Sequence, residues 1–167
     1  KQMETPYSTT IYAIKKAKEN DCLTILNPAP ARKINKDDFK FLDFFTPNET
    51  EAEFYLNKKI ETETDIKNAG KEFLKKGVKN IIITLGEKGV YFANKDQEYF
   101  IEALKLKNKV LDTTGAGDAF NGAFVVGLAN DLKFKDALIF ANKVAGISTT
   151  KVGAANSMPT FEEVENY

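Results

Sequence analysis

The fold of this chain is decided by one stretch of sequence, Val110-Leu-Asp-Thr-Thr-Gly-Ala-Gly-Asp-Ala-Phe-Asn-Gly122. It joins a short apolar segment to a run of small and apolar residues, 119–129, which predicts a helix. A glycine-rich turn that opens a helix leaves backbone N–H groups without partners inside the helix, and the helix dipole adds partial positive charge there. Gly115 and Gly117 lack a Cβ, so the backbone can adopt positive φ and approach a ligand closely. The turn is therefore predicted to bind an anion.

Asp118 needs a separate explanation, because a fixed carboxylate beside an anion site repels a bound phosphate. It could accept a proton from an alcohol that attacks a phosphoryl group. Alternatively, Gly-Ala-Gly-Asp is an ordinary turn in which the aspartate caps a helix. The stretch is not a Walker A loop, because no Gly-Lys-Ser/Thr follows it. It is not a dinucleotide-binding fingerprint either, because Phe120 occupies the place of the third glycine.

Bulk composition restricts the class of protein. The chain has 167 residues, 43% of them hydrophobic, which suits one domain with a core. Its formal net charge is zero and the charges are interspersed, so we expect no nucleic-acid partner, and no apolar run suggests a membrane partner. Cys22 is the single cysteine, which excludes an intramolecular disulfide and favours the cytoplasm. The absence of histidine excludes Ser-His-Asp systems and histidine-ligated metals within these residues.

Segments with helical and strand-like patterns alternate along the chain, which predicts an α/β fold with a doubly wound sheet. Helices are expected at 10–19, 37–42, from Asn48, from Thr62 to Gly77, at 118–130, at 135–149 and after Pro159. Strands are expected at 23–26, 43–46, 80–85, 90–93 and 99–101, the last two as an antiparallel appendage. The residues 151–157 are expected to form a loop, and the small residues of 118–130 (Gly122, Ala123, Gly127) to allow close packing.

Four separated strings resemble motifs of the ribokinase-like (PfkB-type) carbohydrate kinases, in family order. They are Asn27-Pro-Ala-Pro-Ala31, Thr46-Pro-Asn-Glu-Thr-Glu-Ala52, Thr84-Leu-Gly-Glu-Lys-Gly89 and the signature Asp112–Gly122. The resemblance covers the C-terminal half of such enzymes. It implies that residues 1–167 are the C-terminal, nucleotide-binding part of a ribokinase-like domain. The N-terminal half and its lid have no counterpart among these residues. The implied fold is a three-layer, Rossmann-like sheet, mostly parallel with an antiparallel hairpin.

Within that family, the Asn-Pro-Ala-Pro-Ala string and the Lys151-x-Gly-Ala154 string look more like ribokinases than like fructokinases or adenosine kinases. The resemblance thus implies a kinase that transfers the γ-phosphate of ATP to the 5-hydroxyl of D-ribose, with Mg²⁺ and K⁺. Residues 1–167 alone need not be active, and the full-length protein is a candidate homodimer. The alternatives are a kinase of another sugar or nucleoside in the same family, and a non-catalytic nucleotide-binding module.

The resemblance also implies roles for particular residues. Asp118 matches the catalytic base, which also contacts the sugar. Gly115, Ala116 and Gly117 match residues whose backbone N–H groups bind the transferring phosphoryl group. Glu4 matches a carboxylate that contacts a sugar hydroxyl, although a surface glutamate is the simpler reading.

Nucleotide and magnesium positions are implied in the same way. Asn48 and Glu51 match a pair that orders phosphate and Mg²⁺, largely through water, but they also form a capping box at a helix start. Residues matching ATP contacts are Thr84, Gly86, Gly89 and Asn142. For the two glycines, an ordinary tight hairpin is the alternative.

A monovalent cation site is the last implication. The matching positions, mostly through backbone oxygens, are Asp112, Thr114, Ser148, Lys151, Gly153 and Ser157. A potassium ion there would hold the anion-binding turn in shape without touching substrate. The alternative is that these loops are merely neighbours.

Overall fold

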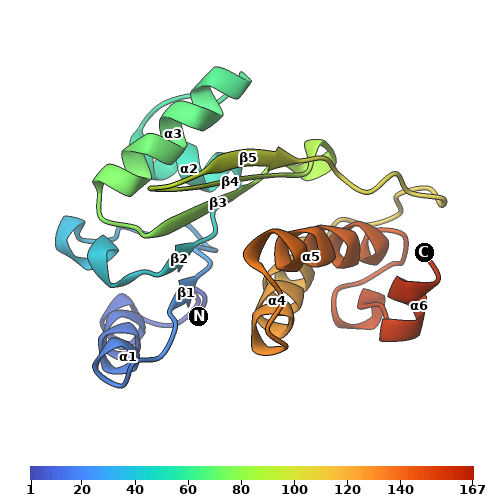
Figure 1. Ribbon diagram of the computed structural model, residues 1–167, viewed down its shortest axis with the longest axis horizontal. Helices are drawn as coiled ribbons and strands as arrows, with labels where there is room; N and C mark the ends of the chain where they lie inside the picture. Colours follow the sequence, from blue (N-terminus) through green and yellow to red (C-terminus); the bar gives the residue numbers. More distant parts are fainter. The chain divides into compact units, whose positions relative to one another are not determined.

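The computed structural model describes residues 1–167, which divide into two compact units. The first unit comprises Lys1–Leu85 and Tyr91–Phe100, and the second comprises Gly86–Val90 and Ile101–Tyr167. Figure 1 shows the helices and strands of both units.

A five-stranded sheet forms the centre of the first unit. Its strands are β1 (Ile25–Leu26), β2 (Phe44–Phe45), β3 (Asn80–Thr84), β4 (Val90–Asn94) and β5 (Glu98–Ile101), and they are ordered β1-β2-β3-β4-β5. The first three strands pair in parallel, with Leu26 opposite Phe45 and Phe45 opposite Ile81. The N–H of Asn94 donates to the carbonyl of Gln97 at 2.9 Å and closes the β4–β5 turn. The mixed α/β sheet with its hairpin is therefore confirmed.

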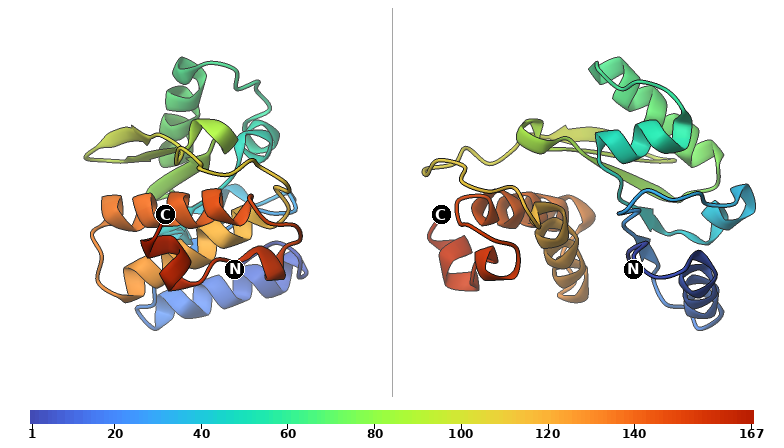
Figure 2. Two further views of the ribbon diagram at one scale, coloured as in Figure 1. Left: turned by 90° about the vertical axis from the view of Figure 1, so that its right-hand side faces the viewer. Right: turned by 180° about the vertical axis from the view of Figure 1, so that it is seen from behind.

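Helices of the first unit follow the predicted pattern closely. They are α1 (Tyr7–Glu19), η1 (Lys36–Phe41), α2 (Glu49–Leu56) and α3 (Glu63–Lys75). Helices α2 and α3 lie over one face of the sheet, whereas α1 packs alongside η1 (Figures 1 and 2). The stripe Ile66, Ala69 and Phe73 of α3 is buried, and Gly77 with φ 106° lies just beyond the helix end as expected.

An aromatic cluster fills the core of the first unit. Phe39 of η1, Phe45 of β2 and Phe73 of α3 are all buried. The ring centroids of Phe39 and Phe45 are 5.6 Å apart with an interplanar angle of 88°, and those of Phe45 and Phe73 are 5.2 Å apart. The edge-to-face geometry of Phe39 and Phe45 adds about 0.5–1.5 kcal/mol beyond area burial. The cluster thereby ties η1 and α3 to the parallel strands.

A buried carboxylate connects three further segments of the first unit. Asp43, immediately before β2, is 4% exposed. It forms ion pairs with Lys18 at 2.9 Å and Lys79 at 2.8 Å, and it accepts the backbone N–H of Thr24 at 3.0 Å. Burial acts to raise the pKa of Asp43, but hydrogen bonds from Lys79, Lys18 and Thr24 lower it to about 2.

The second unit is built around a helix pair. Helix α4 (Ala116–Ala129) packs beside α5 (Phe134–Ser148) (Figures 1 and 2), and the unit also contains η2 (Gly86–Lys88), η3 (Ala155–Ser157) and α6 (Phe161–Glu165). A Cβ at Gly127 would lie 3.0 Å from the Cβ of Ala137, so this glycine permits the close approach that was predicted. Gly122 does not contribute to that packing, because a Cβ there would meet nothing within 4 Å.

Two short segments differ from the sequence-based expectation. The segment expected as a helix at 37–42 is a 3₁₀ helix, and the loop 151–157 contains the 3₁₀ turn η3. Short 3₁₀ turns are common connectors, and their apolar pattern is too brief to separate them from an α-helix or a loop.

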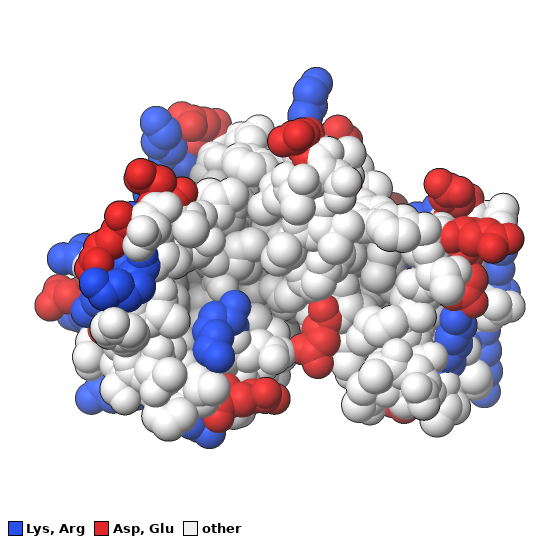
Figure 3. Space-filling view, turned by 90° about the horizontal axis from the view of Figure 1, so that it is seen from below, with Lys and Arg blue, Asp and Glu red and all other residues white.

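Surface charge agrees with the neutral composition. On the face drawn in Figure 3, basic and acidic side chains occur next to one another, without an extended field of either sign. No helix is both long enough and apolar enough to cross a lipid bilayer.

Candidate functional site

The turn before α4 bends at Gly115. This residue is the N-cap of α4, with φ 78° and ψ 0°, a left-handed conformation that favours glycine. A Cβ at this position would lie 3.0 Å from the Cβ of Ala154 and 3.1 Å from its Cα. The requirement for glycine predicted at this position is therefore confirmed, and it has two causes, the backbone conformation and the neighbouring loop.

Gly117 behaves differently from Gly115. It lies in the first turn of α4 and has no positive φ, so the prediction of a left-handed conformation is wrong for this residue. A Cβ there would meet nothing within 4 Å. Its missing side chain thus leaves open space in front of the helix start. The N–H of the intervening Ala116 donates to the carbonyl of Thr113 at 3.2 Å, so it already has a weak partner inside the turn.

Asp118 is the third residue of α4 and is exposed. Because Gly115 is the N-cap, the alternative in which Asp118 caps the helix is wrong. The aspartate lines a cavity of about 230 Å³ whose other walls include Val126, Phe140 and Met158. A carboxylate at such a place is accessible to a substrate, which is the first requirement for a general base.

The carboxylate of Asp112 connects two loops of the second unit. One oxygen, Oδ1, accepts the N–H of Thr114 at 2.9 Å, and Oδ2 accepts the N–H of Gly153 at 2.9 Å. Hydrogen bonds from the hydroxyl and N–H of Thr114, and from the N–H of Gly153, lower the pKa of Asp112. The N–H groups of Leu111 and Asp112 both donate to the carbonyl of Thr149. Three residues of the predicted cation site are therefore together.

The other residues of that predicted site use their side chains locally. The hydroxyl of Ser148 donates to the carbonyl of Ala145 at 2.8 Å, and that of Ser157 donates to the carbonyl of Ala154 at 2.7 Å. Lys151 forms an ion pair with Glu163 at 2.6 Å. The Lys151 ammonium cannot ligate a cation, so Lys151 could contribute only its backbone oxygen, whereas the two hydroxyl oxygens keep their lone pairs.

Three predicted site residues of the first unit lie at the carboxyl ends of the parallel strands β2 and β3, where open α/β sheets bind ligands, namely Asn48, Glu51 and Thr84. Asn48 forms an isolated bridge with Thr84, and the N–H of Thr84 donates to the carbonyl of Pro47 at 3.0 Å. The capping box is present: Glu51 N–H donates to Asn48 Oδ1 at 2.8 Å, and Asn48 N–H donates to Glu51 Oε2 at 2.9 Å. Burial raises the pKa of Glu51, although the Asn48 N–H acts to lower it.

Glu4 lies in the amino-terminal segment that runs beside the loop after β1. Gln2 forms a parallel bridge with Asn27, and the N–H of Met3 donates to the carbonyl of Ala29 at 2.9 Å. The Glu4 side chain is exposed. The backbone of this segment is thus held in place while its carboxylate stays accessible.

In the second unit, Gly89 and Asn142 lie on either side of Glu102. Gly86 and Gly89 have φ of 56° and 100°, as a turn with left-handed residues requires. A Cβ at Gly89 would lie 2.7 Å from the carbonyl carbon of Glu102. The side-chain amide of Asn142 donates to the carbonyl oxygen of Glu102 at 2.7 Å. Two of the predicted nucleotide positions are therefore brought to one backbone segment.

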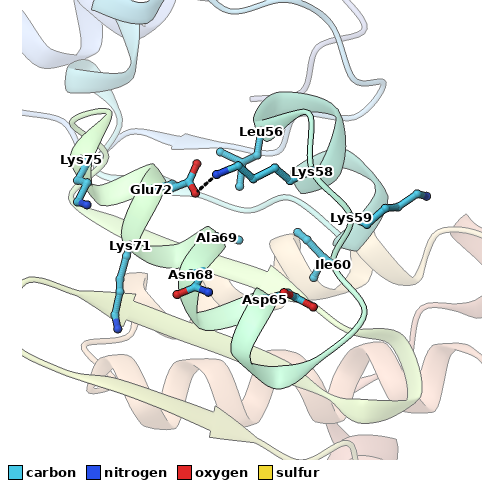
Figure 4. A pocket seen from close by; sticks show the side chains of 10 residues that line it. All are labelled: Leu56, Lys58, Lys59, Ile60, Asp65, Asn68, Ala69, Lys71, Glu72 and Lys75. Atoms are coloured by element: carbon cyan, nitrogen blue, oxygen red, sulfur yellow. Dashed lines mark hydrogen bonds and ion pairs between the residues drawn. The ribbon is translucent and has the colours of Figure 1, made fainter.

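A further cavity of about 240 Å³ lies in the first unit, between α3 and the segment that precedes it. Figure 4 shows that Lys58 reaches Glu72, with which it forms an ion pair at 2.5 Å, whereas Lys71 points away from that pair. None of the residues predicted from the sequence to bind substrate, nucleotide or metal lines this cavity. It is therefore not part of the candidate site.

Comparison with known proteins agrees with this geometry. The model for the pfkB family of carbohydrate kinases matches residues 3–161. The ribokinase of Staphylococcus aureus is 42% identical over 98% of this chain and 53% of its own length. The deoxyribokinase of Salmonella typhi is 35% identical over 99% of this chain and 54% of its own. The structure of Arabidopsis thaliana ribokinase complexed with ribose and ATP has a TM-score of 0.94 and 30% identity, and covers 99% and 53% of the two chains.

The fold and site define an α/β protein in which a glycine turn opens a helix beside an accessible carboxylate. The chain belongs to the pfkB family of carbohydrate kinases. It spans about half the length of the curated relatives that it matches.

Sequence reasoning did not identify Glu102 and Ala154 as neighbours of the site. Each contributes backbone atoms or a methyl group to its contacts with Asn142, Gly89 or Gly115. Backbone contacts of this kind leave no residue-type pattern in a single sequence, so no signal in the chain indicated them.

Proposed function

We propose that the protein containing this chain is an ATP-dependent sugar kinase that transfers the γ-phosphate of ATP to the 5-hydroxyl of D-ribose. The observation that carries the proposal is the exposed Asp118, the third residue of a helix that opens on the left-handed Gly115. The Staphylococcus aureus relative is a ribokinase, and the Arabidopsis ribokinase structure contains ribose and ATP. Both relatives support the choice of substrate and nucleotide.

In the proposed reaction the carboxylate of Asp118 accepts the proton of the sugar hydroxyl as its oxygen attacks the γ-phosphorus. A new O–P bond forms, the bond to the β-phosphate oxygen breaks, and ADP leaves. The backbone N–H groups at the start of α4 stabilise the charge on the transferring group. Loss of one such donor costs about 3 kcal/mol of barrier in comparable sites.

Asn48 and Glu51 would order phosphate and Mg²⁺, largely through water, and the ion would neutralise charge on the phosphates when bound. The residues fit that ion, because the capping box uses Oδ1 of Asn48 and Oε2 of Glu51 but leaves Oε1 of Glu51 for water or metal. A monovalent cation would lie among the backbone oxygens near Asp112 and Gly153, whose loops are already joined. Replacement of K⁺ by Na⁺ is expected to lower turnover, and equal rates in both salts would remove this cation site.

Acceptor identity is the least constrained part of the proposal, and the deoxyribokinase relative favours a second candidate, 2-deoxy-D-ribose. Only two predicted acceptor contacts lie within these residues, namely Glu4 and Asp118. We place the activity in the cytoplasm, because an exposed free thiol such as Cys22 persists in a reducing compartment.

The test is ATP consumption by the full-length protein with D-ribose, 2-deoxy-D-ribose, fructose, adenosine or no sugar. We expect the highest kcat/KM with D-ribose. A higher value with another acceptor would reassign the substrate within the same family. Nucleotide binding without turnover on any acceptor would instead identify a non-catalytic nucleotide-binding module.

A further inference from the structure

The cavity of about 240 Å³ between α3 and the segment that precedes it has an apolar floor and a charged rim (Figure 4). Two residues of the floor, Ile60 and Ala69, are 7% and 3% exposed and belong to the hydrophobic core of the first unit. The preceding segment is also held in place, because Oε1 of Glu53 accepts the N–H of Ile60 at 2.9 Å. The core and this bond therefore fix the shape of the cavity floor.

Positive charge exceeds negative charge on the rim by two. The charged residues that line the cavity are Lys58, Lys59, Lys71, Lys75, Asp65 and Glu72. Both carboxylates already have partners. Asp65 accepts the N–H and the hydroxyl of Thr62 at 2.9 and 2.7 Å, and Glu72 forms the ion pair with Lys58 at 2.5 Å. The excess positive charge is consequently not balanced within the cavity.

Two of these lysines, Lys71 and Lys75, have no carboxylate partner. Both are exposed and form no hydrogen bond or ion pair in the structure. They lie four residues apart on α3, where like charges repel each other. Lys58 also keeps free donors, because its ammonium group has three hydrogens and Glu72 needs only one. The exposed amide of Asn68 is a further donor on the same rim. These side chains can turn toward an anion without losing a contact.

We propose that this cavity binds the dianionic phosphate group of a small molecule, held by Lys71, Lys75 and the free N–H groups of Lys58. Lysine binds phosphate as a compact point charge with several donors. The cavity is larger than a phosphate group alone requires, and the apolar floor of Ile60 and Ala69 accommodates the carbon skeleton of a phosphomonoester. The proposal is independent of the proposed phosphoryl transfer, since no residue assigned to that reaction lines the cavity.

Hydrogen–deuterium exchange of the full-length protein, followed on peptides that cover residues 56–75, tests the proposal. The probes are inorganic phosphate, glycerol 3-phosphate and uncharged glycerol. Because the measurement is local, phosphate bound elsewhere does not contribute to it. We expect both anions to slow exchange in a concentration-dependent manner and glycerol to have no effect. A lower midpoint for glycerol 3-phosphate would identify a phosphomonoester as the ligand, and equal midpoints would identify free phosphate. No protection by either anion would overturn the proposal.

Two variants should move the midpoint in opposite directions. Lys71→Gln/Lys75→Gln should raise it about 5- to 30-fold, because each exposed ion pair contributes modestly. Glutamine has nearly the helix propensity of lysine, so α3 should persist. Glu72→Gln should lower the midpoint about 2- to 5-fold, because it removes a negative charge and releases Lys58. A general loss of structure could not tighten binding in this way.

Lys105→Gln/Lys109→Gln is the matched control. These lysines are also exposed, unpaired and four residues apart, but they do not line the cavity. This variant should keep the wild-type midpoint. An equal rise in both double variants would show that only the net charge matters and would overturn the proposal. A wild-type midpoint in Lys71→Gln/Lys75→Gln would overturn it as well.

Discussion

Asp118 and Asp136 occupy the same position, the third residue, in the neighbouring helices α4 and α5. Both are exposed, so burial does not distinguish them. Their surroundings differ, because only Asp118 follows a left-handed glycine and lines a cavity. The chain thus provides its own control, because Asp118 is proposed as a base whereas Asp136 only lies in the first turn of a helix.

We predict that Asp118→Asn lowers kcat of the full-length protein by about 100- to 10,000-fold, the usual contribution of a positioned base. The KM for ATP should change little, because an amide keeps the shape of the carboxylate and adds no repulsion to phosphate. Steady-state kinetics with ATP and D-ribose would measure both parameters.

Asp136→Asn is the control, since it removes the same charge from the same position of a helix. Each substitution should cost at most about 1 kcal/mol of stability through the helix dipole. Asp136→Asn should leave kcat unchanged. Wild-type turnover in Asp118→Asn would contradict the assignment of the base.

Gly115 and Gly117 allow a second matched prediction. We expect Gly115→Ala to lower the free energy of unfolding by about 1–2 kcal/mol, because alanine is strained at φ 78° and its Cβ would press on Ala154. Gly117→Ala should be neutral or up to about 1 kcal/mol stabilising, since this position is helical and open. If a ligand occupies that open space, the second variant should nevertheless turn over more slowly.

Urea denaturation and kinetics of the two variants would test this separation of stability from activity. A Gly117→Ala protein as unstable as Gly115→Ala would show that the backbone assigned to Gly117 is wrong. Full activity in Gly117→Ala would show that no ligand approaches the helix at that residue.

Predictability from the sequence also differs from residue to residue. The capping pair Asn48 and Glu51 could be predicted because both partners lie within one helical turn. The bond from Asn142 to Glu102 could not, because forty residues separate the partners and one of them contributes only a carbonyl. The helical conformation of Gly117 was missed because glycine adopts positive and negative φ with similar ease.

At the scale of helices and strands, the order of elements was predictable and their exact type was not. Regular periodicity over α3 and α5 identified both helices. The two-residue strands β1 and β2 carry too little pattern to fix their ends. Their position is secured instead by contacts distant in sequence, above all those of Asp43 with Lys18 and Lys79.

The contacts of Asp43 lead to a prediction about how the stability of the fold depends on pH. Its pKa falls from an ordinary 3.8 to about 2 in the folded chain. The Asp43 carboxylate therefore binds a proton more readily in the unfolded state than in the folded state. The stabilisation of the folded state by the charged carboxylate is complete above about pH 4 and is lost as the pH falls toward about 2. At neutral pH we expect Asp43→Asn to cost about 2–4 kcal/mol. That cost should shrink by about 2 kcal/mol across the acidic window.

Urea denaturation of the wild-type and Asp43→Asn proteins at several pH values between about 7 and 2.5 would measure this difference. Asp37→Asn serves as the control, because Asp37 is exposed and has no partner in the structure. A cost for Asp43→Asn that stays constant down to the lowest pH would contradict the role of the charged carboxylate.

At the scale of the whole molecule, the predicted residues are distributed over both compact units. Asn48, Glu51 and Thr84 belong to the first, whereas Asp118 and Asn142 belong to the second. The chain covers 53% of the Staphylococcus aureus ribokinase. Under the proposed function, selection of the acceptor depends on the full-length protein, and the predicted acceptor contacts among these residues are Glu4 and Asp118.

Glu4 is the residue through which that selection can be tested from this chain. Its carboxylate is exposed while its neighbour Met3 is fully buried, so its replacement should not affect folding. We expect Glu4→Gln to raise the KM for D-ribose about 5- to 20-fold, as loss of a charged hydrogen bond to a sugar hydroxyl implies. The KM for ATP should stay constant. Glu61→Gln, at another exposed glutamate, should change neither value. An unaltered KM for D-ribose in the Glu4→Gln protein would show that Glu4 is an ordinary surface residue that does not contact the sugar.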